Sequence, residues 1–92
     1  MNSDEIQAVE SKRQALLSQL NAAESALRSG LHTHGFGSTA RAHMERALAH
    51  VQEAYVAINE IGRARTVQQL VNDLVHVQQV MDDAKRGHSQ SI

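Results

Sequence analysis

The chain contains no cysteine, no proline and only two aromatic residues, and each scarcity excludes a class of protein. Without cysteine there is no disulfide framework, no thiolate nucleophile and no cysteine-bearing zinc finger. The absence of proline, with abundant alanine, leucine, glutamine, glutamate and arginine, favours helices over sheets or disorder. We therefore expect an all-α protein.

The chain also has no large excess of charge of either sign and no long apolar run. The formal net charge is −1 over 92 residues, so no global basic field favours nucleic acid, and we expect no DNA binding. No apolar run approaches the ~18 residues that a membrane span needs. The acidic start MNSDEIQAVE lacks the basic and then apolar pattern of a secretory signal. We expect a cytoplasmic chain with no membrane partner.

What the sequence does contain is a heptad pattern of apolar residues in three segments. Apolar side chains recur at alternating spacings of three and four from Ile6 to Leu27, from Ala40 to Ile61 and from Val67 to Ala84. This spacing places one side chain per turn on a single helix face and favours left-handed, coiled-coil-like packing. The predicted elements are helices at 3–29, 38–61 and 66–86, a turn at 30–37 and a frayed tail at 87–92, all within one domain spanning 1–92.

Glycine and capping residues predict where these helices begin and end. Gly30 suits a left-handed residue after the first helix, and Ser38 or Thr39 can cap the second. Gly62 follows the second helix, and TVQQ at residues 66–69 is a capping box for the third. A kink at Gly62 inside one long helix is the alternative. We favour a break, because the glycine and the capping box indicate it independently.

The second and third helices carry more apolar surface than one seam requires. Val71, Val75 and Val80 flank the main stripe of the third helix, and Leu48 and Tyr55 flank that of the second. A wide core inside a three-helix bundle would account for this, and so would contact with another subunit. A chain of this length buries only about 60–65% of its unfolded surface, so a monomer is marginally stable. We therefore favour a homo-oligomer whose subunit is an antiparallel helical hairpin plus a third helix.

The turn SGLHTHGFGS, residues 29–38, lies in a window without carboxylates that runs from Glu24 to Glu45. GFGST places flexible backbone at a helix N-terminus, where free N–H groups and the positive end of the helix dipole favour phosphate. A plain turn with solubilising basic residues is the simpler interpretation, because no phosphate-binding motif is present. The candidate ligand-binding residues are Arg28, His32, His34, Phe36, Gly37, Arg41 and His43 at this turn, together with Tyr55.

Metal binding and catalysis find little support in the sequence. HTH with His43 and His50 suggests a metal, but there is no HExxH motif and no carboxylate near the turn to complete a ligand set. We expect solvated histidines, no metal and no cofactor. Asp82 and Asp83 are adjacent on a helix and point about 100° apart, so they cannot act as a carboxylate pair. No nucleophile, base and oxyanion motif is present either, and we expect a protein that is not an enzyme.

The stretch ALAHVQEAYVAINEIGRA, residues 47–64, resembles the second hairpin helix of a phage family. That helix reads Leu or Ala, a basic residue or Thr, Leu-Gln/Glu-Glu-Ala, an aromatic or Met, and a late Asn or Lys. The family consists of helical-hairpin proteins that counter bacterial CBASS and Thoeris defences by sequestering signal nucleotides. The resemblance covers residues 3–61, including the polar first helix and the glycine-containing turn. The corresponding residues here are Ala49, His50, Val51, Gln52, Glu53, Ala54, Tyr55 and Asn59.

The resemblance implies an immune-evasion sponge in the host cytoplasm. Such a protein would be a hexamer or other homo-oligomer that binds cyclic di- or trinucleotides between subunits without cleaving them. Arginine would supply forked donors to phosphate, and Phe36 or Tyr55 a stacking surface. The alternative is a protein-interaction module, such as an inhibitor, adaptor or chaperone, whose exposed stripe of Val71, Val75 and Val80 docks a partner helix or groove.

Overall fold

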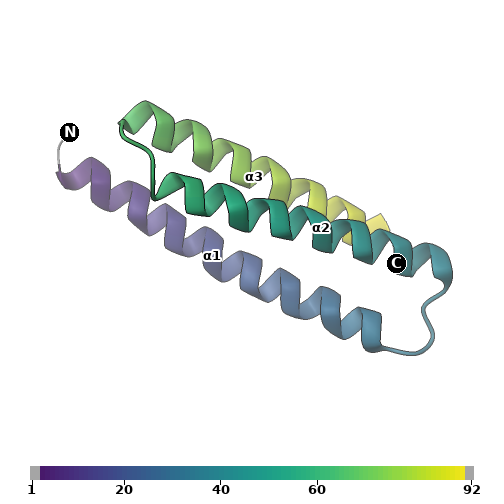
Figure 1. The fold of residues 1–92 in the computed structure, drawn as a ribbon. Coiled ribbons are helices and arrows are strands. Elements are labelled where there is room, and N and C mark those ends of the chain that lie inside the picture. Colours follow the sequence, from purple (N-terminus) through teal and green to yellow (C-terminus); the bar gives the residue numbers. More distant parts are fainter. Residues whose placement is uncertain (1–2, 91–92) are drawn as a thin grey trace.

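The computed structural model describes the backbone of residues 3–90 and the side chains of residues 3–86. This part of the chain forms three helices and no strand: α1 (Ser3–His32), α2 (Ser38–Ile61) and α3 (Val67–Gln90). Figure 1 shows α1 and α3 on either side of α2, both antiparallel to it, in a bundle of 52 × 17 × 16 Å. The predicted all-α, three-helix fold is confirmed. None of the helices in the described part has a stretch long and apolar enough to span a bilayer.

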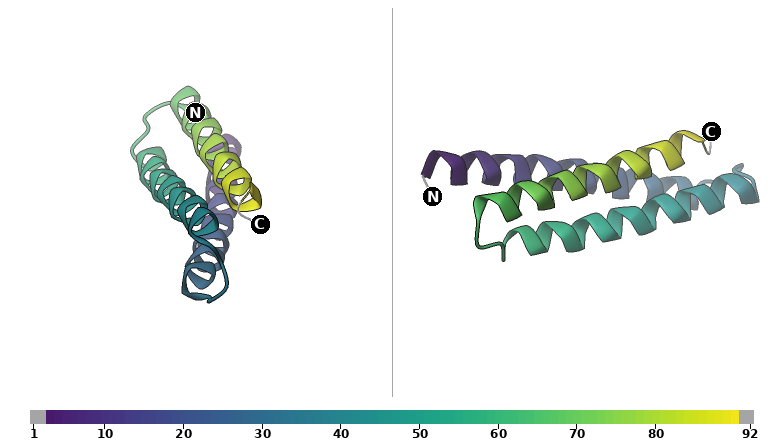
Figure 2. Two further views of the ribbon diagram at one scale, coloured as in Figure 1. Left: turned by 90° about the vertical axis from the view of Figure 1, so that its right-hand side faces the viewer. Right: turned by 90° about the horizontal axis from the view of Figure 1, so that it is seen from above.

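Each helix contacts the other two, so the three enclose a single core (Figure 2). Leu16 and Leu20 on α1, Val51 on α2 and Val77 on α3 are fully buried at its centre. All four stand at heptad positions, because that spacing turns one side chain per turn toward the neighbouring helices. The other core residues are Leu27, Met44, Ala47, Ala54, Ala57, Ile58, Ile61, Val80, Met81 and Ala84.

The three valines that flank the seam of α3 do not share one environment. Val80 is only 6% exposed and belongs to the core, so the prediction that it lies on an exposed stripe is wrong. It follows Val77 by three residues and therefore points to the adjoining side of the same inner face. Val71 and Val75 remain 42% and 53% exposed. The extra apolar surface of α3 is thus partly core and partly open.

The helix α1 runs three residues past its predicted end, because Gly30 lies inside it. A Cβ on Gly30 would lie 3.0 Å from the Met44 sulfur, so the missing side chain lets α1 and α2 approach closely. The helix instead ends at His32, and the N–H of the following Thr33 donates to the Gly30 carbonyl at 3.1 Å. The left-handed residue of the turn is Gly35, with φ 112°. The chain reverses direction there. The connection between the helices is residues 33–37, which is shorter than the predicted turn at 30–37.

The start of α2 also differs from the prediction. Its N-cap is Gly37, in extended backbone, and no side chain makes a capping hydrogen bond. The helix begins at Ser38 itself, so neither Ser38 nor Thr39 stands where a capping side chain must be. The first-turn N–H groups of α2 therefore lack a side-chain acceptor.

The break between α2 and α3 agrees with the sequence pattern. Gly62 is the C-cap of α2, and α3 starts at Val67. The capping box is confirmed: the Thr66 N–H donates to the Gln69 Oε1 and the Gln69 N–H to the Thr66 hydroxyl, both at 3.2 Å. The backbone of α3 is helical to Gln90, four residues past its predicted end. The remainder of the predicted frayed tail, residues 91–92, lies outside the described residues.

Candidate functional site

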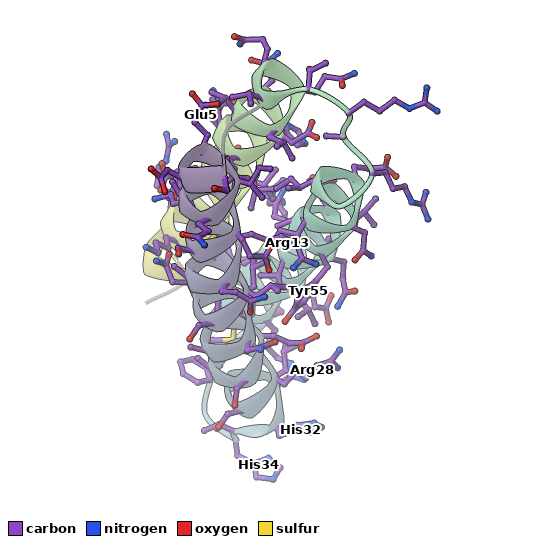
Figure 3. All side chains as sticks on the ribbon, turned by 90° about the vertical axis from the view of Figure 1, so that its left-hand side faces the viewer. Glu5, Arg13, Arg28, His32, His34 and Tyr55 are labelled. Carbon is purple, nitrogen blue, oxygen red and sulfur yellow. The ribbon has the colours of Figure 1, made fainter. Side chains whose placement is uncertain are left out.

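Seven of the eight predicted ligand-binding residues gather at one end of the bundle. This end, the glycine-turn pole, consists of residues 28–43: the last turns of α1, the connection to α2 and the first turns of α2. His32, His34 and Phe36 are exposed there, and Figure 3 shows Arg28, His32 and His34 directed into solvent. The pole is basic and open.

Glu24, which stands at the start of the segment without carboxylates, places its own carboxylate at the edge of this pole. The Glu24 carboxylate accepts hydrogen bonds from Arg28 at 3.3 Å and from Gln52 of α2 at 3.2 Å. Part of the positive charge of Arg28 is therefore neutralised. Arg41 and His43 are half-buried, and the His43 Nδ1 is a buried nitrogen without a hydrogen-bond partner in the described structure.

Tyr55, the eighth predicted residue, is not brought to the pole. It stands eighteen residues beyond Gly37 on α2, roughly 27 Å along the helix axis. Its hydroxyl donates to the Asn21 Oδ1 of α1 at 2.5 Å, which ties the two helices together. Burial raises the pKa of Tyr55, and the neighbouring Glu24 carboxylate raises it further. The structure thus places Tyr55 in a contact between helices.

This contact predicts a loss of stability at alkaline pH. The folded-state pKa of Tyr55 lies above its usual value of 10.0, so the unfolded chain releases the phenolic proton at lower pH than the folded chain does. The contribution to stability is therefore complete below about pH 10 and is lost as pH rises through the folded-state pKa. Tyr55→Phe should remove this dependence. Tyr55 is the only tyrosine, so its phenolate absorbance in folded and urea-unfolded protein checks the order of the two pKa values. A lower pKa in the folded protein would contradict the prediction.

A cavity lies in a groove between α1 and α3, and none of the pole residues lines it. Its volume is about 510 Å³, and its floor is Val51 of α2. The wall on α1 carries the small side chains of Ala22, Ala23 and Ala26, which leave room between the two helices. The remaining lining residues are Gln19, Leu20, Leu27, Met81, Ala84 and Lys85. The groove is therefore almost entirely apolar, with one amide and one ammonium group at its edge.

Sequence reasoning missed this groove, although a signal for it was present. Ala8, Ala15 and Ala22 are spaced by seven, and Ala26 follows by four, which is a second heptad series of small residues beside the main seam of α1. Small residues on one face of a helix permit the close approach of another helix. That series indicates a second packing surface on α1.

Two smaller cavities flank the turn between α2 and α3. One, of about 400 Å³, is lined by Ile6, Val9 and Leu70 together with Arg13 and neighbouring residues. Arg13 occupies an apolar seam position: its Nε is buried without a hydrogen-bond partner in the described structure, while its Nη1 lies 3.2 Å from the Glu10 carboxylate. The other, of about 370 Å³, is polar and includes Glu60, Arg63, Asn72 and Asp73. None of the eight predicted residues lines any of the three cavities.

Among the described side chains no three of histidine, cysteine, aspartate or glutamate lie close enough to hold a metal ion. Comparison with known protein families, with curated proteins and with solved structures found no match. The groove and the glycine-turn pole are therefore the two candidate functional sites.

Proposed function

We propose that the chain is a non-enzymatic binding protein that docks an amphipathic helix in the groove between α1 and α3. The observation that carries this proposal is the groove itself, an apolar channel of about 510 Å³ between two parallel helices. A helix that lays its apolar face into such a groove removes both surfaces from water, at about 25 cal/mol per Å² of apolar area. The alanines of α1 allow that helix to approach closely. No catalytic group is required.

The test uses a fluorescent peptide of three heptads with leucine at both seam positions and glutamate and lysine elsewhere. We expect saturable binding, measured by fluorescence anisotropy. Ala26→Arg should weaken this binding about tenfold or more, because it puts a charge in an apolar contact. Ala49→Arg is the matched control, since Ala49 is exposed on α2 and lies away from the groove. Equal binding by the two variants would count against the groove.

A second candidate function is the sequestration of cyclic oligonucleotides at the glycine-turn pole. What favours it is the lack of carboxylates between Glu24 and Glu45, together with an N-terminus of α2 that has neither an acidic first turn nor a side-chain cap. Phosphate is stabilised by free N–H groups at such a helix end. The likeness of residues 3–61 to the phage hairpin proteins supports the same ligand class, bound between the subunits of a homo-oligomer.

Calorimetry with a panel of cyclic di- and trinucleotides tests this second candidate. The unmodified chain should give binding heat. Arg41→Ala removes a hydrogen-bond donor at the pole and should weaken the affinity about tenfold or more. Arg63→Ala, at the opposite end of the bundle and largely exposed, is the control. No heat from any nucleotide in the panel would eliminate this function and leave the docking function unaffected.

A further inference from the structure

Lys85 is the only charged group among the described residues that line the groove between α1 and α3. Gln19 supplies a single amide, and every other lining side chain is an alkyl group or a thioether. Lys85 is exposed as a residue, so its ammonium group keeps access to water at the edge of the groove. The groove therefore combines apolar walls with one positive charge.

The carboxylates nearest to Lys85 along the chain are engaged by other side chains. Asp82 accepts a hydrogen bond from Gln78 at 3.3 Å, and Asp83 lies 3.2 Å from the Arg86 guanidinium. None of the ion pairs among the described residues includes Lys85. Its charge is therefore not neutralised from its own helix.

The α1 wall of the groove does not neutralise this charge either. Its lining residues, from Gln19 to Leu27, include no carboxylate. Glu24 lies in the same stretch of α1 but accepts its hydrogen bonds from Arg28 and from Gln52 of α2, on the side of α1 that packs against α2. An anionic group that enters the groove would therefore meet Lys85 without an opposing carboxylate in the wall.

The groove has the volume and the length of a site for a small apolar ligand. Its volume of about 510 Å³ lies within the ~300–1,000 Å³ typical of ligand pockets. Along α1 it runs from Gln19 to Leu27, which is about 12 Å at 1.5 Å per residue. An extended hydrocarbon chain advances roughly 1.25 Å per carbon, because its C–C bonds are about 1.5 Å long. A chain of about ten carbons would therefore span the groove.

We propose that the groove binds a medium-chain fatty acid, with its alkyl chain between α1 and α3 and its carboxylate at Lys85. One ammonium group matches the single charge of a carboxylate. A phosphate head group carries more charge and favours the forked donors of arginine, and no arginine is present among the described lining residues.

The fatty acid would cover the same apolar walls as the helix proposed above and would therefore exclude it. The binding of the fatty acid goes beyond the docking function. Its effect as a regulator of docking rests on that function.

Calorimetry of the whole chain with a series of fatty acids tests the apolar part of the site. Hexanoate, octanoate and decanoate are used at concentrations at which each is monomeric. We expect the affinity to rise about fourfold with each added methylene, because each buried methylene contributes a similar apolar area. No heat from decanoate, or equal affinity for hexanoate and decanoate, would overturn the proposal.

Filling the groove tests where the chain lies. Ala26→Trp puts a large side chain in the space of the alkyl chain and should weaken decanoate binding about tenfold or more. Ala26 is exposed, so this change leaves the core intact, as circular dichroism would verify. Ala49→Trp is the matched control, because Ala49 is exposed on α2 and does not line the groove. Equal weakening by the two variants would place the ligand elsewhere and overturn the site.

The head group is tested by removing the charge of Lys85. Lys85→Gln should weaken decanoate binding about threefold, the effect of one exposed ion pair, and should leave the binding of uncharged decanol unchanged. Lys12→Gln is the matched control, since Lys12 is the other lysine of the chain and does not line the groove. An equal effect of Lys85→Gln on decanoate and decanol would overturn the placement of the carboxylate.

Competition with the fluorescent heptad peptide separates this inference from the docking function. We expect decanoate to displace the peptide. A chain that binds the peptide, with Ala26→Arg weakening that binding, but gives no heat with decanoate retains the docking function and overturns the fatty-acid site. A chain that binds decanoate in an Ala26→Trp-sensitive manner but does not bind the peptide retains the fatty-acid site and overturns the docking function.

Discussion

Leu20→Ala is expected to lower the free energy of unfolding by about 2–5 kcal/mol, a large fraction of the about 5–15 kcal/mol by which such domains are stable. Leu20 is fully buried on α1 and lines the groove together with Val51 of α2 and Met81 of α3. Its removal therefore costs apolar contact with both other helices and enlarges an existing cavity. Urea unfolding followed by circular dichroism measures the change.

Ile6→Ala is the matched control, because it removes the same number of carbon atoms from α1 at a position that is 48% exposed. Its cost should stay below about 1 kcal/mol. Both variants must be compared at one protein concentration, since self-association would contribute to the measured stability. Equal losses in the two variants would contradict a core centred on Leu20.

Gly35→Ala is expected to destabilise the chain by about 1–3 kcal/mol, whereas Gly62→Ala should stabilise it by about 0.4–1 kcal/mol. Gly35 has φ 112°, a conformation that strains any residue with a Cβ, although no atom lies within 4 Å of one built there. Gly62 has φ −64° and ψ −16°, and its added Cβ would make only an ordinary contact of 3.4 Å with the Asn59 carbonyl. The two effects therefore differ in sign.

Thermal unfolding resolves this pair of variants, because 1 kcal/mol shifts the Tm of a chain of this size by about 4–8 °C. The Tm should fall for Gly35→Ala and rise for Gly62→Ala. A fall of similar size in the Tm of both variants would show that the two turns require glycine to the same extent. That result would contradict the backbone geometry described above.

The candidate sites were less predictable than the fold. The sequence identified eight candidate ligand-binding residues, and seven of them do lie at one end of the bundle. Tyr55 was grouped with them because it is one of only two aromatic residues, but its hydroxyl contacts Asn21 on α1. The groove was missed because alanine carries little hydrophobic signal on its own. The row of alanines on α1 lines an open groove only because α3 does not pack directly against it.

The sequence by itself determined the features that depend on neighbours in the chain. Heptad spacing produced three helices, and the reciprocal hydrogen bonds of Thr66 and Gln69 start the third, because both need only residues within a few positions. Only the tertiary structure decided which apolar side chains are covered. Val80 and Val75 are both flanking valines of α3, yet one is buried and the other exposed. The physical reason is that periodicity sets the direction of a side chain on its own helix, whereas burial depends on where the other two helices lie.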